Sequence, residues 1–312
     1  MLSRAAGIAL GVLADRIFGD PARHHPVAWF GTWAMRVEEH THHDSRPAGA
    51  VHVVATTAPW LAAAVVAERW TRRRPLLHVG ATAVVTWACV GARTLEREGT
   101  QLADHLDDGD LAAARDRLPH LCGRDPSGLP ENELARAALE SMAENTADAA
   151  VASIFWGALL GVPGLVGHRA VNTLDAMVGS FSERYKNFGT ASARLDDLLD
   201  LVPARVTGTL ACLLAPAVGG DTREAWRVMR RDGHKHPSPN GGWCESAWAG
   251  ALGVQLGGQN VYAHRVEERP LLGDGEPANA HTLRQGARLV GLVTGAATAL
   301  AVGALIITGS RK

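Results

Sequence analysis

Carboxylates and amides stand at both ends of an apolar segment in the middle of the chain. At its start, Glu144 and Asp148 are four residues apart within E-N-T-A-D, which places both acids on one face of a helix. At its end, Asn172 and Asp175 lie one turn apart within N-T-L-D. Oxygen ligands of this kind suit Mg²⁺, which proteins bind through carboxylates together with substrate phosphates. We therefore expect Glu144, Asp148 and Asp175 to hold Mg²⁺, with ordinary helix caps as the alternative interpretation.

The two polar ends can share one site only if the segment between them turns back. A straight helix from residue 145 to residue 175 would hold its ends about 45 Å apart. The residues G-V-P-G at 161–164 interrupt the segment, and glycine and proline end or kink helices. We predict a broken helix pair around residues 145–178, which would bring the two polar ends together.

The elements that must position these groups are apolar helices. Mean hydropathy is close to zero, but apolar residues gather in six blocks, at 5–13, 49–67, 76–95, 149–171, 206–218 and 290–308. Several approach the roughly 20 residues that a membrane-spanning helix needs. The segment 289–309 has no charge and is followed by two basic residues. We predict an all-α, polytopic integral membrane protein of the cell membrane, crossing it several times and forming one domain over residues 1–312.

The polar segments between the blocks are also expected to contain helices. Leu102, Leu106 and Leu111 recur at helical spacing, and a later helix runs into Glu144. The rigid stretch H-P-S-P-N at 236–240 precedes a helix that opens near Trp243. The free N–H groups of that helix would hold an anion or simply be capped by the loop. The segment V-E-E-R-P-L-L-G-D-G at 266–275 is expected to be a turn.

Composition and missing motifs exclude several classes of protein. The four cysteines are scattered without metal-site spacing, so they are interpreted as packing residues with no disulfide framework. A net charge of −1 and the absence of a basic tract exclude a nucleic-acid-binding protein. The chain contains no G-x-x-x-x-G-K-[ST], G-x-S-x-G or H-E-x-x-H. An ATP-dependent enzyme with this sequence would need an unfamiliar nucleotide site.

The ordered motifs together resemble the CbiB/CobD family of cobalamin biosynthesis, the adenosylcobinamide-phosphate synthases. They span nearly the whole chain, and their order and spacing are far more specific than any one block. The blocks are G-D-P at 19–21, H-P-V at 25–27, E-N-T-A-D at 144–148, N-T-L-D-A-M-V-G at 172–179, E-R-Y at 183–185, S-A-R-L-D-D at 192–197, P-A-R at 203–205, H-P-S-P-N at 236–240, A-G-A-L-G-V at 249–254 and E-E-R-P at 267–270. The chain departs from the family pattern at Ser180, Ser182, Thr190 and Cys244, which bears on substrate contacts more than on the reaction.

The resemblance implies a membrane ligase that forms a C–N amide bond. Its substrates would be ATP with Mg²⁺, the corrinoid adenosylcobyric acid, and aminopropanol or its O-phosphate. The amine would be joined to the remaining free propionate of the corrinoid through an acyl phosphate, giving adenosylcobinamide or its phosphate. The resemblance further implies contact with the lipid bilayer and with other membrane enzymes of the cobalamin pathway, and no nucleic acid.

The matching motifs also carry candidate roles for individual residues. The acids that would be catalytic, holding Mg²⁺ or orienting a base, are Glu144, Asp148, Asp175 and Glu183. The residues that would bind substrate and phosphate are Asp20, His25, Asn145, Asn172, Arg184, Arg194, Arg205, His236, Ser238 and Asn240. Arginine suits this role because its guanidinium forms paired hydrogen bonds with phosphate oxygens.

Two other functions and the membrane topology stay open at this point. A membrane transporter would also use broken helices with polar ends, although no repeated half is visible and the polar motifs lie largely in loops. A scaffold for enzymes of corrinoid biosynthesis is the other alternative. If the arginines at 72–74 lie on the cytoplasmic side, the region 96–148 lies outside, whereas ATP chemistry requires it inside. We therefore expect one or more apolar blocks to be re-entrant.

Overall fold

The computed structural model of this chain describes residues 1–21, 25–179, 182–262 and 265–310. Ser180, one of the departures from the family pattern, lies outside the described residues. The elements, in chain order, are α1 (Leu2–Phe18), α2 (Pro26–Thr41), α3 (Arg46–Thr71), α4 (Pro75–Cys89), α5 (Ala92–Asp107), α6 (Leu111–Arg117), η1 (Leu118–His120), α7 (Glu131–Thr146), η2 (Ala147–Val151), α8 (Ala152–Leu160), α9 (Val162–Val178), α10 (Thr190–Leu214), η3 (Ala215–Val218), α11 (Thr222–Asp232), α12 (Gly241–Leu252), β1 (Leu256–Tyr262), β2 (Arg265–Leu272) and α13 (Ala280–Ser310). The mostly helical fold and the helices in the polar segments confirm the predicted class.

The chain divides into two compact units that interleave along the sequence. Unit 1 contains residues 1–91, 152–200 and 298–312, and unit 2 contains residues 92–151 and 201–297. Because α10 and α13 contribute residues to both units, no single linker in the sequence marks the division. The expected single domain over 1–312 stays a prediction.

Four stretches among the described residues are long and apolar enough to cross a membrane. They are Arg46–Thr71, Pro75–Asp107, Thr190–Val218 and Ala280–Ser310. These stretches contain four of the six apolar blocks seen in the sequence. The other two blocks form α1, of 17 residues, and the pair α8 and α9, of 9 and 17 residues. All four cysteines are free thiols in the structure.

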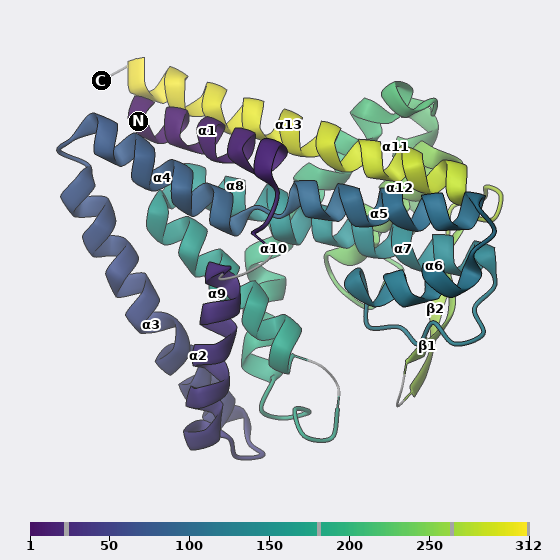
Figure 1. The fold of residues 1–312 in the computed structure, drawn as a ribbon, viewed down its shortest axis with the longest axis horizontal. Coiled ribbons are helices and arrows are strands. Elements are labelled where there is room, and N and C mark those ends of the chain that lie inside the picture. Colours follow the sequence, from purple (N-terminus) through teal and green to yellow (C-terminus); the bar gives the residue numbers. More distant parts are fainter. Residues whose placement is uncertain (22–24, 180–181, 263–264, 311–312) are drawn as a thin grey trace. The chain divides into compact units, whose positions relative to one another are not determined.

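Small residues allow the helices of unit 1 to pack closely. Helices α1 and α4 lie side by side (Figure 1), and a side chain added at Gly7 of α1 would put its Cβ 2.5 Å from Cβ of Thr82 in α4. Close approach of this kind through glycine and threonine is common between membrane helices. Helices α3 and α4 are joined by the short arginine turn expected from the sequence. A core cluster between α2, α3 and α9 contains Phe30, Ala34, Val53, Ala170 and Leu174.

The predicted break in the central segment is confirmed at Gly161. This residue has φ +74°, a conformation that favours glycine, and α8 and α9 pack against each other on either side of it. Buried side chains from α1 and α3 satisfy the backbone groups that the break exposes. Arg4 donates to the carbonyls of Ala158 and Leu159 at 3.2 Å, and Glu68 accepts the N–H of Val162 at 3.1 Å. The two side chains also pair with each other at 2.9 Å, so the break is held by charges as well as by chain conformation.

Replacing Gly161 with alanine is expected to lower the melting temperature of the protein in detergent substantially. A Cβ there would lie 2.6 Å from Nη2 of Arg4 and 2.7 Å from Oε2 of Glu68, and the backbone conformation alone, with φ +74° and ψ −147°, costs residues other than glycine on the order of 1–3 kcal/mol. Gly80→Ala is the matched control, because a Cβ at that glycine of α4 meets nothing within 4 Å. Equal melting temperatures for the two variants would contradict this account of the break.

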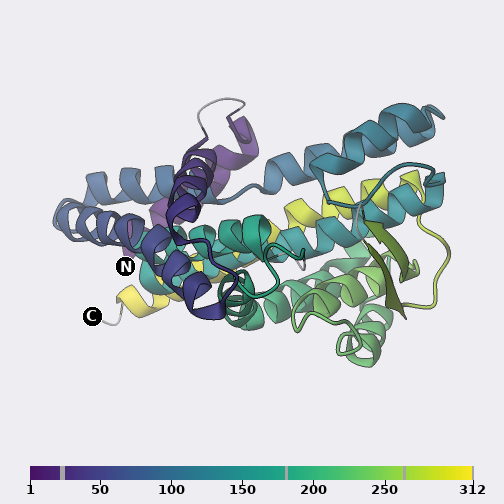
Figure 2. The ribbon, with the colours of Figure 1, turned by 90° about the horizontal axis from the view of Figure 1, so that it is seen from below.

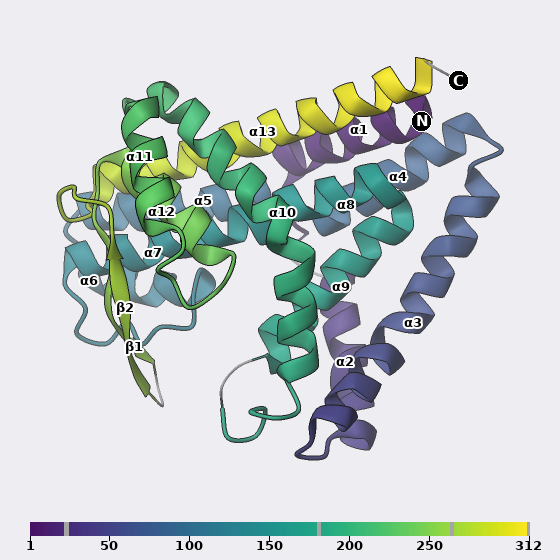
Figure 3. The same cartoon turned by 180° about the vertical axis from the view of Figure 1, so that it is seen from behind.

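Unit 2 contains a paired set of helices and a β-hairpin. Helices α11 and α12 pack together (Figure 3), since Gly250 allows close contact: a Cβ there would lie 2.7 Å from Cα of Ala225. Strands β1 and β2 pair antiparallel, with Gly258 opposite Arg269 and a bulge between Leu256 and Gly258. Figure 2 shows the two olive strands running side by side, and β1 contacts α7.

The hairpin corrects the expectation of a turn at 266–275, since most of that segment is strand β2. The reason lies in α7, where Arg136 donates to the carbonyls of Gly257 and Gln259 in β1. These contacts join residues more than 120 positions apart, so the local sequence pattern does not reveal them.

Candidate functional site

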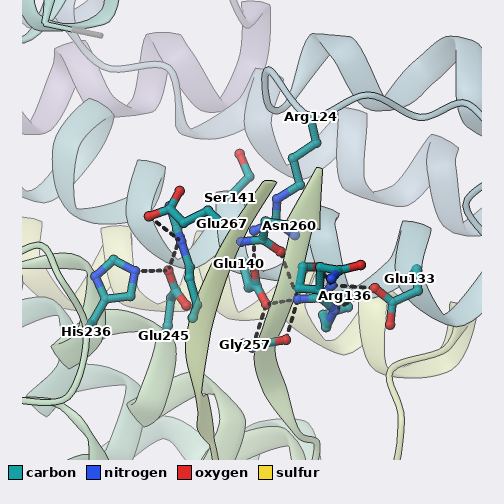
Figure 4. Close-up of polar contacts among 12 residues, drawn as sticks. Arg124, Glu133, Arg136, Glu140, Ser141, His236, Glu245, Gly257, Asn260 and Glu267 are labelled. Atoms are coloured by element: carbon teal, nitrogen blue, oxygen red, sulfur yellow. Dashed lines mark hydrogen bonds and ion pairs between the residues drawn. The ribbon is translucent and has the colours of Figure 1, made fainter. Parts of the chain in front are cut away.

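Four ionisable side chains of unit 2 meet where α7, α12 and the hairpin contact one another. They are Glu144 of α7, His236 of the loop before α12, Glu245 of α12 and Arg269 of β2, and we call them the unit 2 cluster. One ligand atom from each of Glu144, His236 and Glu245 lies within 4.8 Å of the others. Two carboxylates and an imidazole at this spacing can hold a divalent cation or move a proton between them. Figure 4 shows His236 and Glu245 facing each other.

Glu245 is the most unusual member of this cluster. Its side chain is fully buried, and neither carboxylate oxygen finds a hydrogen-bond donor within the described part of the chain. Two basic side chains lie close to it, with Nε2 of His236 and Nη1 of Arg269 each 3.5 Å from Oε1. Burial, together with the charge of Glu144, raises the pKa of Glu245 well above its ordinary value. A buried carboxyl group with a raised pKa can serve as a proton donor or acceptor in general acid–base catalysis.

The H-P-S-P-N loop presents His236 to Glu245. The ring atom Nδ1 of His236 accepts the N–H of Ser238 at 3.1 Å, which leaves Nε2 to carry the proton toward the acid. Oγ of Ser238 accepts the N–H groups of Asn240 and Gly241 at 3.2 Å. Arg205 donates to Oδ1 of Asn240 at 3.3 Å. Four residues predicted to bind substrate therefore frame one loop.

The loop at 236–240 also caps the start of helix α12. Helix α12 starts at Gly241, two residues before Trp243, and Ser238 caps its first N–H group. Oε1 of Glu144 lies so close to Gly241 that any Cβ there would overlap it. Glycine at this position is therefore needed for the carboxylate of α7 to reach the loop. Burial lowers the pKa of His236, and Glu144 partly opposes this shift.

Glu140 lies one turn before Glu144 on α7 and differs from Glu245 in its surroundings. It accepts hydrogen bonds from Arg124, from Arg136 and from the N–H of Gly257, the last at 2.7 Å. Burial alone would raise its pKa, but the two arginines outweigh that effect and lower it. Glu140 is thus a buried anion with several partners that fastens the hairpin to α7, whereas Glu245 is a buried carboxyl whose raised pKa favours its protonated form.

Unit 1 contains a second group of acids, around Asp175 of α9. Burial raises the pKa of Asp175 to about 6, and the negative charges of Asp197 and Asp200 contribute to the shift. Asp200 in turn lies 2.9 Å from Nε2 of His168. Asp175 therefore lies near carboxylates of α10, which the sequence analysis did not propose as its partners.

The other predicted site residues lie in several places. In unit 2, Asn145 donates to the carbonyl of Ser141 at 2.9 Å, and Asp148 lies in η2, a π-helical turn of a kind frequent at functional sites. In unit 1, His25 caps α2 and lies 3.3 Å from Asp20. Asn172 lies on α9 of unit 1 and accepts a hydrogen bond from Arg169 at 3.4 Å. Arg184 donates to Glu38 at 2.8 Å. Glu183 and Arg194, also in unit 1, are exposed.

The two motifs proposed to share one Mg²⁺ site fall in different units. Glu144 and Asp148 belong to unit 2, and Asn172 and Asp175 belong to unit 1. The shared site over Glu144, Asp148 and Asp175 stays a prediction. Among the described residues, two groups within single units lie close enough to hold a cation: Glu144, His236 and Glu245 in unit 2, and His168, Asp196 and Asp200 in unit 1.

Sequence reasoning missed several of these residues, although a signal was present. Glu245 is the sole charge in the small, apolar run G-G-W-C-E-S-A-W-A-G-A-L, and His168 lies with Arg169 inside an apolar block. An isolated ionisable residue in such a run indicates a buried charge, which is costly unless it has a partner or a function. Arg269 belongs to the E-E-R-P motif at 267–270, but the sequence analysis assigned no function to it.

Comparison with known proteins finds close relatives over the full length of the chain. A family model described as CobD/Cbib protein matches residues 8–290. The chain is 49% identical over 301 residues to the cobalamin biosynthesis protein CobD of Mycobacterium tuberculosis strain H37Rv, covering 96% of this chain and 95% of the relative. It is 42% identical over 296 residues to CobD of Geobacter metallireducens, covering 93% of each chain. With CobD of Chromobacterium violaceum it shares 37% identity over 319 residues, or 99% of each chain. No solved structure matches the chain.

Proposed function

This chain belongs to the CobD/CbiB family of cobalamin biosynthesis proteins, and on that basis we propose that it is an ATP-dependent amide ligase. Its substrates are adenosylcobyric acid, ATP with Mg²⁺, and aminopropanol or its O-phosphate. The products are adenosylcobinamide or its phosphate, ADP and inorganic phosphate. The protein acts as a multi-pass protein of the cell membrane, in contact with lipid and with other membrane enzymes of the pathway.

The observation that best supports a catalytic role is the buried carboxyl of Glu245 beside His236 and Arg269. Amide formation through an acyl phosphate has two steps. The corrinoid propionate first attacks the γ-phosphate of ATP and releases ADP. The amine then attacks the acyl carbon, inorganic phosphate leaves, and the attacking nitrogen loses a proton. That second step needs a base held away from water, and the unit 2 cluster supplies buried groups that can accept the proton.

Charge on the phosphates must also be neutralised during transfer. Mg²⁺ bound with ATP would supply that neutralisation, and Glu144, Asp148 and Asp175 are the residues proposed to hold it. Arg205 is already oriented against the loop at 236–240, and its guanidinium lies 5.1 Å from the ring of Trp243. An arginine fixed in this way suits the binding of a phosphate group.

Purified protein in detergent is expected to release ADP and form the amide when given adenosylcobyric acid, aminopropanol phosphate, ATP and Mg²⁺. ADP release should fall to background when the corrinoid is omitted, since the propionate is the group that attacks ATP. ADP can be followed by a coupled assay and the product by mass spectrometry. ATP turnover that is unchanged without the corrinoid contradicts the proposal. Corrinoid uptake into liposomes without ATP consumption would instead support the transporter.

A further inference from the structure

Three buried side chains of unit 1 form a group that the proposed ligase reaction does not use. They are His168 of α9 and Asp196 and Asp200 of α10, and their exposed fractions are 2%, 8% and 1%. One ligand atom from each lies within 4.8 Å of the others. Asp196 and Asp200 lie one turn apart on the same face of α10, and His168 reaches them from α9.

The hydrogen bonds of this group leave it incomplete. Nε2 of His168 lies 2.9 Å from Oδ1 of Asp200, and Nδ1 lies 3.2 Å from Oγ of Ser153. Oδ2 of Asp200 and Oδ1 of Asp196 are buried, and neither has a hydrogen-bond partner among the residues that the structure describes. A single imidazole, even when protonated, cannot balance two carboxylates. Buried charges in proteins are paired, coordinate metals or are neutralised by protonation, and a bound cation would satisfy both unpartnered carboxylate oxygens.

We propose that His168, Asp196 and Asp200 bind a divalent transition-metal ion of the Zn²⁺ or Mn²⁺ class. The imidazole nitrogen favours such an ion over Mg²⁺, which prefers oxygen ligands and retains water. Ser153 supports this choice, because a hydrogen-bond partner on Nδ1 fixes the ring and leaves Nε2 for the metal. The two unpartnered carboxylate oxygens provide the anionic ligands. None of these three residues is itself a proposed Mg²⁺ ligand, although Asp200 belongs to the acid group around Asp175, and the inference does not depend on the ligase activity.

The metal content of purified protein tests this proposal. Wild-type protein is loaded with Zn²⁺ in detergent, dialysed against metal-free buffer, and measured by inductively coupled plasma mass spectrometry. We expect about one retained ion per chain, and a more than tenfold loss in His168→Gln and Asp200→Asn. His52→Gln is the matched control, since His52 is a buried histidine of unit 1 that bonds Thr41 at 2.9 Å. His236→Gln separates this site from the unit 2 cluster, and both controls should retain the ion.

A measurement on the wild-type chain keeps the test independent of how the variants fold. X-ray absorption spectra at the zinc edge should show nitrogen and oxygen ligands with the scattering pattern of one imidazole. Adding Zn²⁺ should raise the melting temperature, and dialysis with a chelator should reverse the change, because an ion that binds only the folded state stabilises it.

Three outcomes would overturn the proposal. Wild-type protein would retain no transition metal after dialysis, or His236→Gln would lose the ion while His168→Gln kept it, or the absorption spectrum of the retained zinc would show no imidazole ligand. None of these measurements requires ATP or corrinoid. If the protein retains zinc but has no ligase activity, the metal site is supported and the proposed function is contradicted. If wild-type protein retains no zinc but forms the amide, the proposed function is supported and the metal site is contradicted.

Discussion

Replacing Glu245 with glutamine is expected to reduce the rate of amide ligation by about 100-fold or more, which is the lower range for losing a general acid or base. The same change should leave the folded protein as stable as the parent or more stable. In the parent, the Glu245 carboxyl is fully buried, and no donor within the described residues satisfies its oxygens. Glutamine has nearly the same shape and no charge to desolvate, and its amide can donate to a carboxylate such as Glu144.

The measurement compares kcat and melting temperature on the same detergent preparations. A loss of rate without a loss of stability identifies Glu245 as part of the reaction. If the variant melts well below the parent while each folded molecule ligates at the parent rate, Glu245 is a structural residue and the proposed role is wrong. Measuring both quantities on one sample prevents a poorly folded preparation from being mistaken for an inactive one.

Replacing Glu140 with glutamine is expected to have the opposite effect on stability. Removing one partner from a buried ion pair costs about 3–5 kcal/mol, because the remaining charge stays buried without compensation. Two arginines, Arg124 and Arg136, would lose their shared anion, and the N–H of Gly257 would lose its charged acceptor. Both acids are buried glutamates of unit 2 with 1% exposure or less, so the pair of variants differs mainly in how the parent carboxylate is satisfied.

Thermal and denaturant unfolding of the Glu140→Gln variant in detergent provide the measurement. The hairpin should loosen first, because Arg136 and Glu140 connect it to α7, and amide exchange in β1 and β2 should report this. Since Glu140 is proposed to be a structural anchor, the folded fraction should retain much of the parent activity. A melting temperature equal to that of the parent would contradict the assigned network.

The order of the motifs and the pattern of apolar blocks were enough to predict the family, the helical class and the break at residue 161. The helices and the break depend on interactions between residues that are close in the sequence. Apolar length selects helices that can cross a membrane, and glycine and proline interrupt a helix within a turn of where they stand. The break appears where the G-V-P-G run begins, with Gly161 in a conformation that favours glycine.

The tertiary structure decided which charges meet and which of them are satisfied. The apolar run around Glu245 indicates a buried charge but does not say whether that charge is satisfied; in the fold, Glu140 accepts bonds from two arginines, whereas Glu245 has no donor among the described residues. The hairpin likewise depends on Arg136, whose contacts in β1 lie more than 120 residues away. Asp175 was predicted from its motif, but its acidic neighbours in α10 and the nearby His168 emerged only from packing. The reason is physical: helix formation depends on neighbours in the sequence, whereas burial and electrostatic interaction depend on distance in space, which the chain sets only when it folds.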